Sequence, residues 1–401
     1  MNNITNWPHT PAAAQEPPVP TLDRPMTPAE NPTQSFDRLS HSPELPTRSK
    51  TLLVGLDLGT NTTCIEFADS ESANTQLSEL IPSIVGYTRP GLLPDVIPGN
   101  ETTLFGTDAL KHKLHLNLVQ PLRDGIIENK DAVRDFMEHL KSKTGDTENT
   151  ELRAVIGVPS NSSPEARENV RVAATGLFDK VILIPEPFLA ALGCREASKL
   201  SEADYVDPIT NSIFVDIGAG SSDICLIQGY YPSKEDQISF PFAGDAVDEL
   251  IQEAILAKYP DCGISVAKCR EIKEQHSFVR GAKDSVEVPV MVAGKIKQLE
   301  VADAIDNACN ALLEKIYEAV RALIVKADPD SIPDLLQNII MTGGGSMISG
   351  IAQALQDMLT EEGFEGCQVS AIGETFKTRV ATGALTAARQ ASDRQWQTLI
   401  K

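Results

Sequence analysis

Two short segments of the chain combine an aspartate, glycines and hydroxyl side chains at the same spacing. In each segment, an apolar run leads into Asp-x-Gly, two further residues and a hydroxyl pair, and a second apolar run follows. The first copy is Asp57, Gly59, Thr62 and Thr63, and the second is Asp216, Gly218, Ser221 and Ser222. Glycines in a tight turn let backbone N–H groups approach an anion closely, and the hydroxyls add donors. The pattern predicts two phosphate-binding turns, and its repetition indicates a duplicated domain.

The two aspartates predict a metal ion beside the phosphates. A carboxylate repels phosphate, but Asp57 and Asp216 can hold Mg²⁺ through water, because this ion binds few carboxylates and keeps several waters. Two facing turns would then clamp a triphosphate, with the metal between the aspartates. The alternative is that the turns only close two β-hairpins, but the matched pair favours nucleotide binding. The residues predicted to bind the phosphates are Gly59, Thr60, Asn61, Thr62, Gly218, Ala219, Gly220 and Ser221.

A glycine run follows a third apolar strand, 339–341, and precedes a predicted helix. Glycines at this position allow a purine or ribose to lie flat against the backbone, with phosphate near the helix N-terminus. A flexible turn is the alternative, but the two aspartate turns favour a nucleotide. The predicted contacts are Gly343, Gly344, Gly345 and Ser346.

Apolar periodicity places these motifs on alternating strands and helices. Strands are predicted at 52–54, 154–159, 181–184, 213–215 and 339–341. One helix is predicted at 164–174, starting beside the Ser-Pro cap at Ser163, and a second is predicted to be capped by Asp245. Further helices are predicted at 305–323 and from Gly350. This alternation indicates an α/β fold.

Length and composition fit a two-domain globular protein. The chain has 401 residues, 41% hydrophobic and 23% charged. No window offers the roughly 20 apolar residues of a membrane span, and no secretory signal is visible, so the chain is predicted to be cytoplasmic. The net charge of −21 disfavours binding to nucleic acid or anionic lipid, and makes self-association sensitive to salt and divalent cations. Seven scattered cysteines without zinc-type spacing are predicted to be small buried hydrophobes.

Residues 1–50 differ from the rest of the chain. They contain ten of the 26 prolines and little apolar periodicity, so they cannot bury enough surface to offset ordering entropy. The segment is predicted to be a disordered extension. A solvated extension without fixed contacts is one interpretation, and a tether that binds a protein partner is the other.

The two turns, the glycine run and two connecting segments at 121–127 and 380–384 together resemble the actin and MreB superfamily, which includes sugar kinases and heat-shock ATPases. The resemblance covers roughly residues 52–390. It implies an actin-like α/β fold: two ribonuclease H-like domains flank a nucleotide cleft, and each carries a smaller subdomain. ATP or ADP with Mg²⁺ is the implied cofactor.

The resemblance also implies roles for individual residues. Segment 184–191 is similar to the Glu-Pro stretch of bacterial actins, which implies that Glu186 orients or activates the attacking water. Alternatively, Glu186 only ends a strand and favours a helix N-terminus. Ser221 lies where bacterial actins usually carry a threonine beside the γ-phosphate, so it joins Glu186 and Asp216 as a catalytic candidate. Lys273 and Glu274 match adenosine contacts, although a solvated charge pair fits equally.

The implied domain limits follow from the same match. Domain I spans 51–205, with a small subdomain at about 82–118, and is completed by 381–401. Domain II spans 206–380, with a small subdomain at about 244–302. Outside the nucleotide motifs, segments 235–237, 243–245, 273–279 and 336–339 look like those of magnetosome actin-like proteins.

The implied function is an ATP-hydrolysing, homopolymeric cytoskeletal filament that organises intracellular structures such as magnetosomes, without direct membrane insertion. Three alternatives remain open at this level. They are a small-molecule kinase of the same superfamily, a chaperone-type ATPase and a scaffold that does not hydrolyse ATP. Few residues follow the last core segment, which disfavours the chaperone.

Overall fold

A computed structural model describes residues 50–72, 74–123, 126–145, 147–202, 205–280 and 285–399. The predicted extension at 1–50 therefore lies outside the described residues, except for Lys50. The first connecting segment is described only at 121–123 and 126–127.

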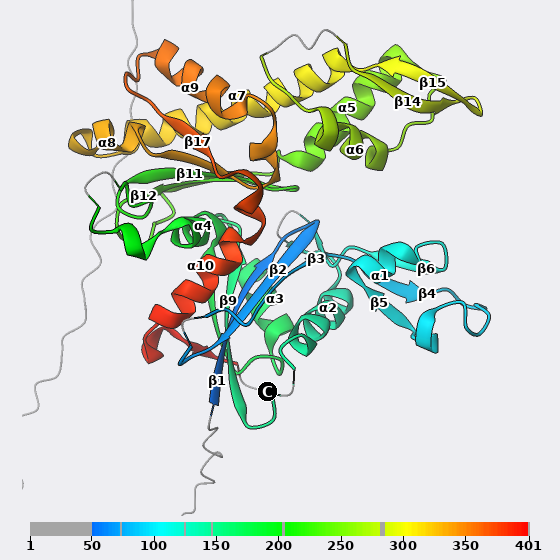
Figure 1. The fold of residues 1–401 in the computed structure, drawn as a ribbon, viewed down its shortest axis with the longest axis horizontal. Coiled ribbons are helices and arrows are strands. Elements are labelled where there is room, and N and C mark those ends of the chain that lie inside the picture. Colours follow the sequence, from blue (N-terminus) through cyan, green and yellow to red (C-terminus); the bar gives the residue numbers. More distant parts are fainter. Residues whose placement is uncertain are drawn as a thin grey trace, which may run out of the picture. The chain divides into compact units, whose positions relative to one another are not determined.

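The first sheet combines an antiparallel meander with two parallel strands. Its order is β18-β10-β9-β1-β2-β3 (Figure 1). Strands β1, β2 and β3 pair antiparallel, β9 pairs parallel with β1, and β10 pairs parallel with β9. The bounds are β1 (Lys50–Leu58), β2 (Thr62–Asp69), β3 (Leu77–Pro82), β9 (Thr150–Val158), β10 (Lys180–Pro185) and β18 (Gln397–Thr398).

The second sheet repeats this topology. Its order is β13-β12-β11-β16-β17, with an antiparallel meander β11-β12-β13 and with β16 and β17 added in parallel. The bounds are β11 (Ser212–Ile217), β12 (Ser222–Ile227), β13 (Gln237–Phe240), β16 (Ile339–Thr342) and β17 (Val369–Ala371). The duplication predicted from the repeated turn is therefore present in the fold, whereas the exact domain limits stay a prediction.

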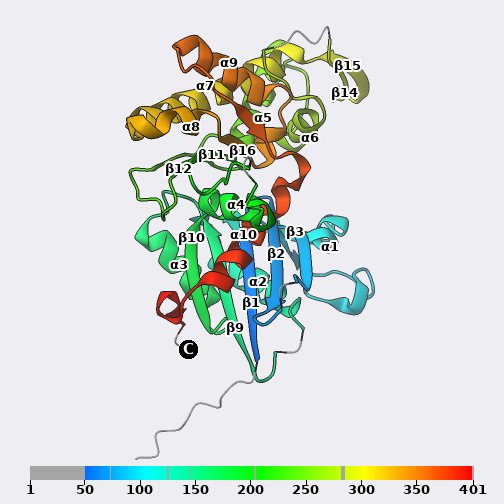
Figure 2. The ribbon, with the colours of Figure 1, turned by 60° about the vertical axis from the view of Figure 1, so that its left-hand side comes forward.

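Helices follow the strands in corresponding places around the two sheets (Figures 1 and 2). Beside the first sheet they are α2 (Lys130–Ser142), α3 (Pro164–Ala174) and α4 (Glu186–Cys194). Beside the second they are α7 (Ala302–Lys326), α8 (Ile332–Leu336) and α9 (Ile351–Glu362), whereas the last helix, α10 (Phe376–Gln390), packs against β1 and β9 of the first sheet. Short 3-10 turns cover Pro98–Asn100, Ala197–Lys199, Pro329–Ser331, Gly344–Met347, Gly373–Thr375 and Asp393–Gln395.

Each meander is followed by an insertion. The first comprises β4 (Val85–Thr88), β5 (Thr103–Phe105), α1 (Gly106–Lys111) and β6 (Leu116–Val119), and the short hairpin β7 (Leu122–Arg123) and β8 (Ile126–Ile127) comes next. The second comprises α5 (Gly244–Lys258), α6 (Val266–His276), β14 (Glu287–Val292) and β15 (Lys295–Glu300). Both insertions begin within two to four residues of the last meander strand, so they extend from the same end of the repeated unit.

Side-chain caps account for the starts of α2, α3 and α6. Ser163 caps α3 as predicted, because its hydroxyl accepts the Ala166 N–H. The predicted cap at Asp245 is wrong: α5 begins one residue earlier, at Gly244, with Ala243 in the cap position. The Asp245 carboxylate is instead drawn to Arg270, at 2.8 Å, so ion pairing takes precedence over capping.

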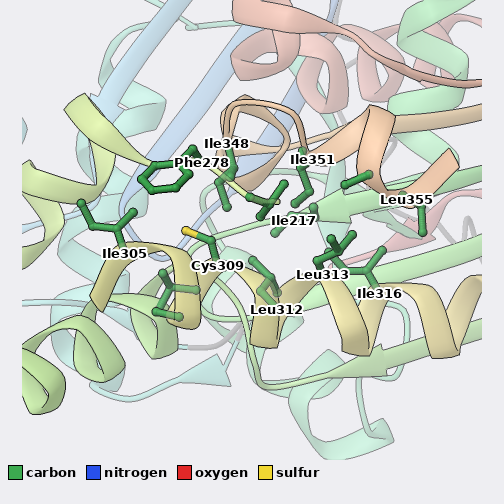
Figure 3. Packing of buried hydrophobic residues seen from close by; sticks show 14 of the residues in the cluster. Ile217, Phe278, Ile305, Cys309, Leu312, Leu313, Ile316, Ile348, Ile351 and Leu355 are labelled. Carbon is green, nitrogen blue, oxygen red and sulfur yellow. The ribbon is translucent and has the colours of Figure 1, made fainter. Parts of the chain in front are cut away.

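A large apolar core surrounds α7, whose buried positions recur at helical spacing. Figure 3 shows side chains of α7, among them Ile305, Leu312 and Ile316, packed against Ile217 at the end of β11 and Leu355 of α9. This packing fixes the end of β11, from which the second aspartate turn starts.

Helices α4 and α10 lie side by side and fill the space between the two sheets. Their apolar residues join one cluster with Leu53 and Val155 of the first sheet and Phe214 of the second. The helices cross at glycines: a Cβ atom on Gly383 would lie 1.8 Å from the Leu189 carbonyl oxygen, and one on Gly193 would lie 2.0 Å from the Arg379 carbonyl oxygen. Only glycine permits this approach.

All seven cysteines are free thiols, six buried and Cys194 half-buried, in agreement with the prediction. None of the helices within the described ranges combines the length and the apolar character that a membrane span requires.

Candidate active site

A cavity of about 980 Å³ opens where the turns after β1 and β11 meet. It is lined by nearly all the residues predicted to bind nucleotide: Asp57, Gly59, Thr60, Asn61, Thr62, Glu186, Asp216, Gly218, Ala219, Gly220, Ser221, Lys273, Glu274, Gly343, Gly344 and Gly345. Ser346 is the exception. It is buried, and its hydroxyl donates to the Gly343 carbonyl at 2.7 Å.

The two turns are built alike. Asp57 lies opposite Cys64 in the β1–β2 ladder, and Asp216 lies opposite Asp223 in the β11–β12 ladder. The second residue of each hydroxyl pair is buried and turned away from the cavity. Thr63 is hydrogen-bonded to Ser83 at 2.9 Å, and Ser222 donates to the Phe242 carbonyl at 2.9 Å. The first residue of each pair, Thr62 and Ser221, lines the cavity instead.

Three carboxylic acids of the cavity have pKa values that are raised by burial and, for two of them, by the charges of neighbouring carboxylates. Burial raises the pKa of Asp57 to about 7. Burial, with the charges of Asp57 and Asp223, raises the pKa of Asp216 to about 8. The pKa of Glu186 is raised well above its usual value by burial and by Asp57, Asp223 and Asp216. Each side chain keeps some exposed area, yet each is surrounded closely enough by protein to lose most of its hydration.

Asp223 is a member of this cluster that the sequence prediction missed. It is only 2% exposed, and burial raises its pKa, opposed by its hydrogen bonds. One carboxylate oxygen accepts the Ser221 hydroxyl at 2.8 Å, and the other accepts the backbone N–H of Ser160 at 2.9 Å. Asp223 thereby orients the cavity hydroxyl of Ser221 and ties β12 to the segment after β9. A carboxylate inside an otherwise apolar strand was the sequence signal that could have identified it.

The donor set suits a magnesium nucleotide. Neighbouring buried carboxylates repel one another when they are ionised, and a bound cation offsets this repulsion. No group of three or more Asp, Glu, His or Cys side chains that could hold a metal directly is found in the part of the chain that the structure describes. Mg²⁺ needs few protein ligands when it keeps its waters and phosphate oxygens.

The glycine run is explained partly by packing. A Cβ atom on Gly343 would lie 2.5 Å from the Asp216 Oδ1 atom, and one on Gly345 would lie 2.1 Å from Ile217. These two glycines let β16 approach the end of β11. At Gly344 an added Cβ would meet only the Phe376 ring, at 3.9 Å, so this residue leaves open surface in the cavity.

The predicted adenosine contacts lie on α6, at the cavity wall. Glu274 is exposed there. Lys273 is not a free cation, because its Nζ atom lies 2.8 Å from the Asp248 Oδ1 atom and donates to the Gly244 carbonyl at 2.5 Å. Arg270, one turn earlier on α6, also lines the cavity and was not predicted.

Comparison with known proteins identifies the family. The sequence model of the family described as MreB/Mbl protein matches residues 51–392. The chain belongs to this MreB/Mbl family. The match covers the second sheet, the first sheet except β18, and every cavity-lining residue named above. The cavity is therefore a feature of an MreB/Mbl protein with the actin-like fold.

Relatives include the actin-like protein MamK of Magnetospirillum gryphiswaldense, 30% identical over 79% of this chain and 87% of that protein. MamK of Paramagnetospirillum magneticum is 30% identical over 87% of this chain and 95% of that protein. The cell shape-determining protein Mbl of Bacillus subtilis is 26% identical over 60% of this chain and 72% of its own.

Solved MreB/Mbl-type structures resemble this one throughout. A MamK double helical filament gives a TM-score of 0.75 at 29% identity, covering 85% of this chain and 100% of that chain. A non-polymerising MamK mutant bound to AMPPNP gives 0.61 at 29% identity, covering 84% and 98%. MreB5 of Spiroplasma citri bound to ADP, at 20% identity and a TM-score of 0.67, shares the fold.

The raised pKa values predict how the stability of this protein depends on pH when neither metal nor nucleotide is bound. Asp57 and Asp216 bind protons more tightly folded than unfolded, so their contribution to stability is complete below about pH 4 and is lost as pH rises through about 7 and 8. We expect the free energy of unfolding, measured in urea, to fall from pH 6 to pH 8.5. The Asp57→Asn/Asp216→Asn double variant should show a shallower fall. An equal slope in both proteins would contradict the proposed crowding of these carboxylates.

Proposed function

We propose that this chain binds Mg-ATP in the cavity between its two aspartate turns, hydrolyses it, and assembles into nucleotide-dependent filaments. The observation that carries the proposal is the convergence of Asp57 and Asp216, from matched turns of two repeated sheets, on one cavity with Glu186. AMPPNP and ADP in the related structures support nucleotide as the ligand, and the MamK filament supports self-assembly.

In this proposal each turn supplies backbone N–H groups to the phosphates, and Thr62 of the first turn adds a hydroxyl donor. Asp57 and Asp216 hold Mg²⁺ through water, and the ion neutralises phosphate charge. Gly344 offers a flat surface to the base or ribose, beside Glu274 of α6.

Glu186 has the chemistry of a group that receives a proton from water. Its position at the start of α4 puts it in the cavity together with Asp57 and Asp216, and its raised pKa makes it a stronger proton acceptor than an ordinary carboxylate. Ser221, held by Asp223 at 2.8 Å, would direct its remaining lone pairs toward the same region. Phosphoryl transfer to water mainly needs an aligned water and charge neutralisation, and this set supplies both.

By analogy with MamK, the filament would be a cytoskeletal element that positions intracellular structures such as magnetosomes. Assembly has to overcome repulsion between copies of net charge −21, so divalent cations should promote it and low ionic strength should oppose it.

Electron microscopy and sedimentation of the purified chain test this function. We expect filaments with Mg-ATP and few or none without nucleotide, and phosphate release without any added acceptor. The Asp57→Asn/Asp216→Asn variant should neither release phosphate nor sediment. Turnover that requires a small-molecule acceptor would indicate a kinase instead, and sedimentation that ignores nucleotide would overturn the proposed coupling.

A further inference from the structure

Two cationic side chains of α6, Arg270 and Lys273, form ion pairs with carboxylates of α5. Asp248 is fully buried, and its two oxygens lie 2.9 Å from the Arg270 Nε atom and 2.8 Å from the Lys273 Nζ atom. The Asp245 carboxylate lies 2.8 Å from the Arg270 Nη2 atom. Two cations therefore face two anions beside the cavity, so neither α6 cation is a free charge that could clamp a phosphate.

These ion pairs fix the Arg270 guanidinium through its Nε and Nη2 atoms and leave its third nitrogen, Nη1, for the opposite wall. Its Nη1 atom donates to the Asn61 Oδ1 atom at 3.2 Å. Asn61 belongs to the turn between β1 and β2 in the first sheet, whereas Arg270 belongs to the insertion of the second sheet. The contact therefore crosses the cavity from α6 to the first phosphate turn.

The Asn61 side chain is shared with a second, weaker donor, the Gln120 amide at 3.5 Å. Its backbone carbonyl accepts the Ser83 N–H at 2.9 Å, which holds the turn to the end of β3. The position of the turn thus depends on contacts within its own sheet and on one charged donor from the other side.

We propose that Arg270 is a positioning residue for nucleotide binding, acting through Asn61 to hold the turn 59–62 against α5 and α6. The inference rests on the proposed binding of Mg-ATP in this cavity. Because the guanidinium is already ordered by Asp245 and Asp248, its bond to Asn61 costs little further ordering. Coupling is reciprocal, so a ligand that orders the turn also strengthens the bond across the cavity.

Arginine is required for this arrangement because its planar fork reaches three acceptors in fixed directions, and lysine offers a single charged nitrogen. Arg270→Lys keeps the charge but loses the fork. Asn61→Ala removes only the acceptor across the cavity. It leaves both ion pairs of Arg270 intact, so the buried Asp248 carboxylate keeps its partner and the fold is not put at risk.

A double-mutant cycle tests the proposal. The dissociation constant of Mg-AMPPNP is measured for the wild type, Asn61→Ala, Arg270→Lys and the double variant. Loss of a hydrogen bond to a charged group predicts a rise of about tenfold in each single variant. Because both changes break the same bond, the double variant should rise no further than the single variants. Lys268→Ala removes an α6 charge that pairs with Glu271 of the same helix. It serves as the matched control and should bind like the wild type.

Steady-state phosphate release separates positioning from general damage. We expect KM for Mg-ATP to rise in Asn61→Ala and Arg270→Lys by a larger factor than kcat falls, because neither side chain is among the catalytic candidates Glu186, Asp216 and Ser221. Damage to the fold would instead lower kcat through a smaller active fraction. The inference would be overturned if the dissociation constant of Mg-AMPPNP rose about a hundredfold in the double variant, the product of the two single effects, or if the single variants bound like the wild type. A wild type that fails to bind Mg-AMPPNP would reject the proposed function itself.

Discussion

Replacing Glu186 by alanine or glutamine is expected to lower steady-state phosphate release by about 10²–10⁴-fold, the range for loss of a positioned general base. Both variants lose the proton acceptor, and Glu186→Gln keeps the size of the side chain. Mg-AMPPNP should bind as tightly as in the wild type, or more tightly, because one carboxylate leaves the crowded set formed with Asp57 and Asp216. Phosphate release and equilibrium binding measured on the same samples check both parts.

The competing interpretation is that Glu186 only favours the N-terminus of α4. In that case removal of its charge would cost about 0.3–1 kcal/mol of stability and leave turnover intact. Glu165, in the first turn of α3, gives a matched control, because Glu165→Gln removes the same type of charge from the same part of another helix. Turnover that falls equally in the Glu165 and Glu186 variants, or in neither, would remove Glu186 from the mechanism.

Replacing Gly383 by alanine should cost about 3 kcal/mol or more of unfolding free energy, as expected for overpacking that backbone atoms cannot relieve. The added Cβ would lie 1.8 Å from the Leu189 carbonyl oxygen and 2.9 Å from the Gly193 nitrogen, so α4 and α10 would have to separate. Helix propensity alone predicts the opposite sign, since alanine within a helix is favoured over glycine by about 0.5–1 kcal/mol. Urea unfolding therefore decides between the two effects by the sign of the change.

Gly263 provides the control, because an added Cβ there would meet nothing within 4 Å and its φ is not positive. Gly263→Ala should change stability by less than about 0.5 kcal/mol. The Gly383 variant should also lose turnover in the fraction that stays folded, since α4 begins at Glu186 and α10 begins at Phe376, and both residues line the cavity. An unchanged or increased stability of Gly383→Ala would show that the crossing of these helices is looser than the structure indicates.

The sequence by itself determined the parts of this protein that depend on local pattern. The repeated Asp-x-Gly turns, the strands that lead into them, the Ser163 cap of α3 and the long α7 follow from apolar periodicity and turn chemistry, which act over a few residues. The repeat also indicated that Asp57 and Asp216 belong together, because matched motifs in a duplicated fold occupy matched places.

The tertiary structure decided what depends on contacts between distant segments. Asp223 is hydrogen-bonded to Ser160 and Ser221. Asp245 forms an ion pair with Arg270 instead of the predicted cap, and Arg270 donates to Asn61 across the cavity. The tertiary structure also assigned Gly343 and Gly345 to packing against β11, and left Gly344 facing open space. Spacing along the chain carries no information about such pairs, because burial and charge act through space between residues up to 209 positions apart.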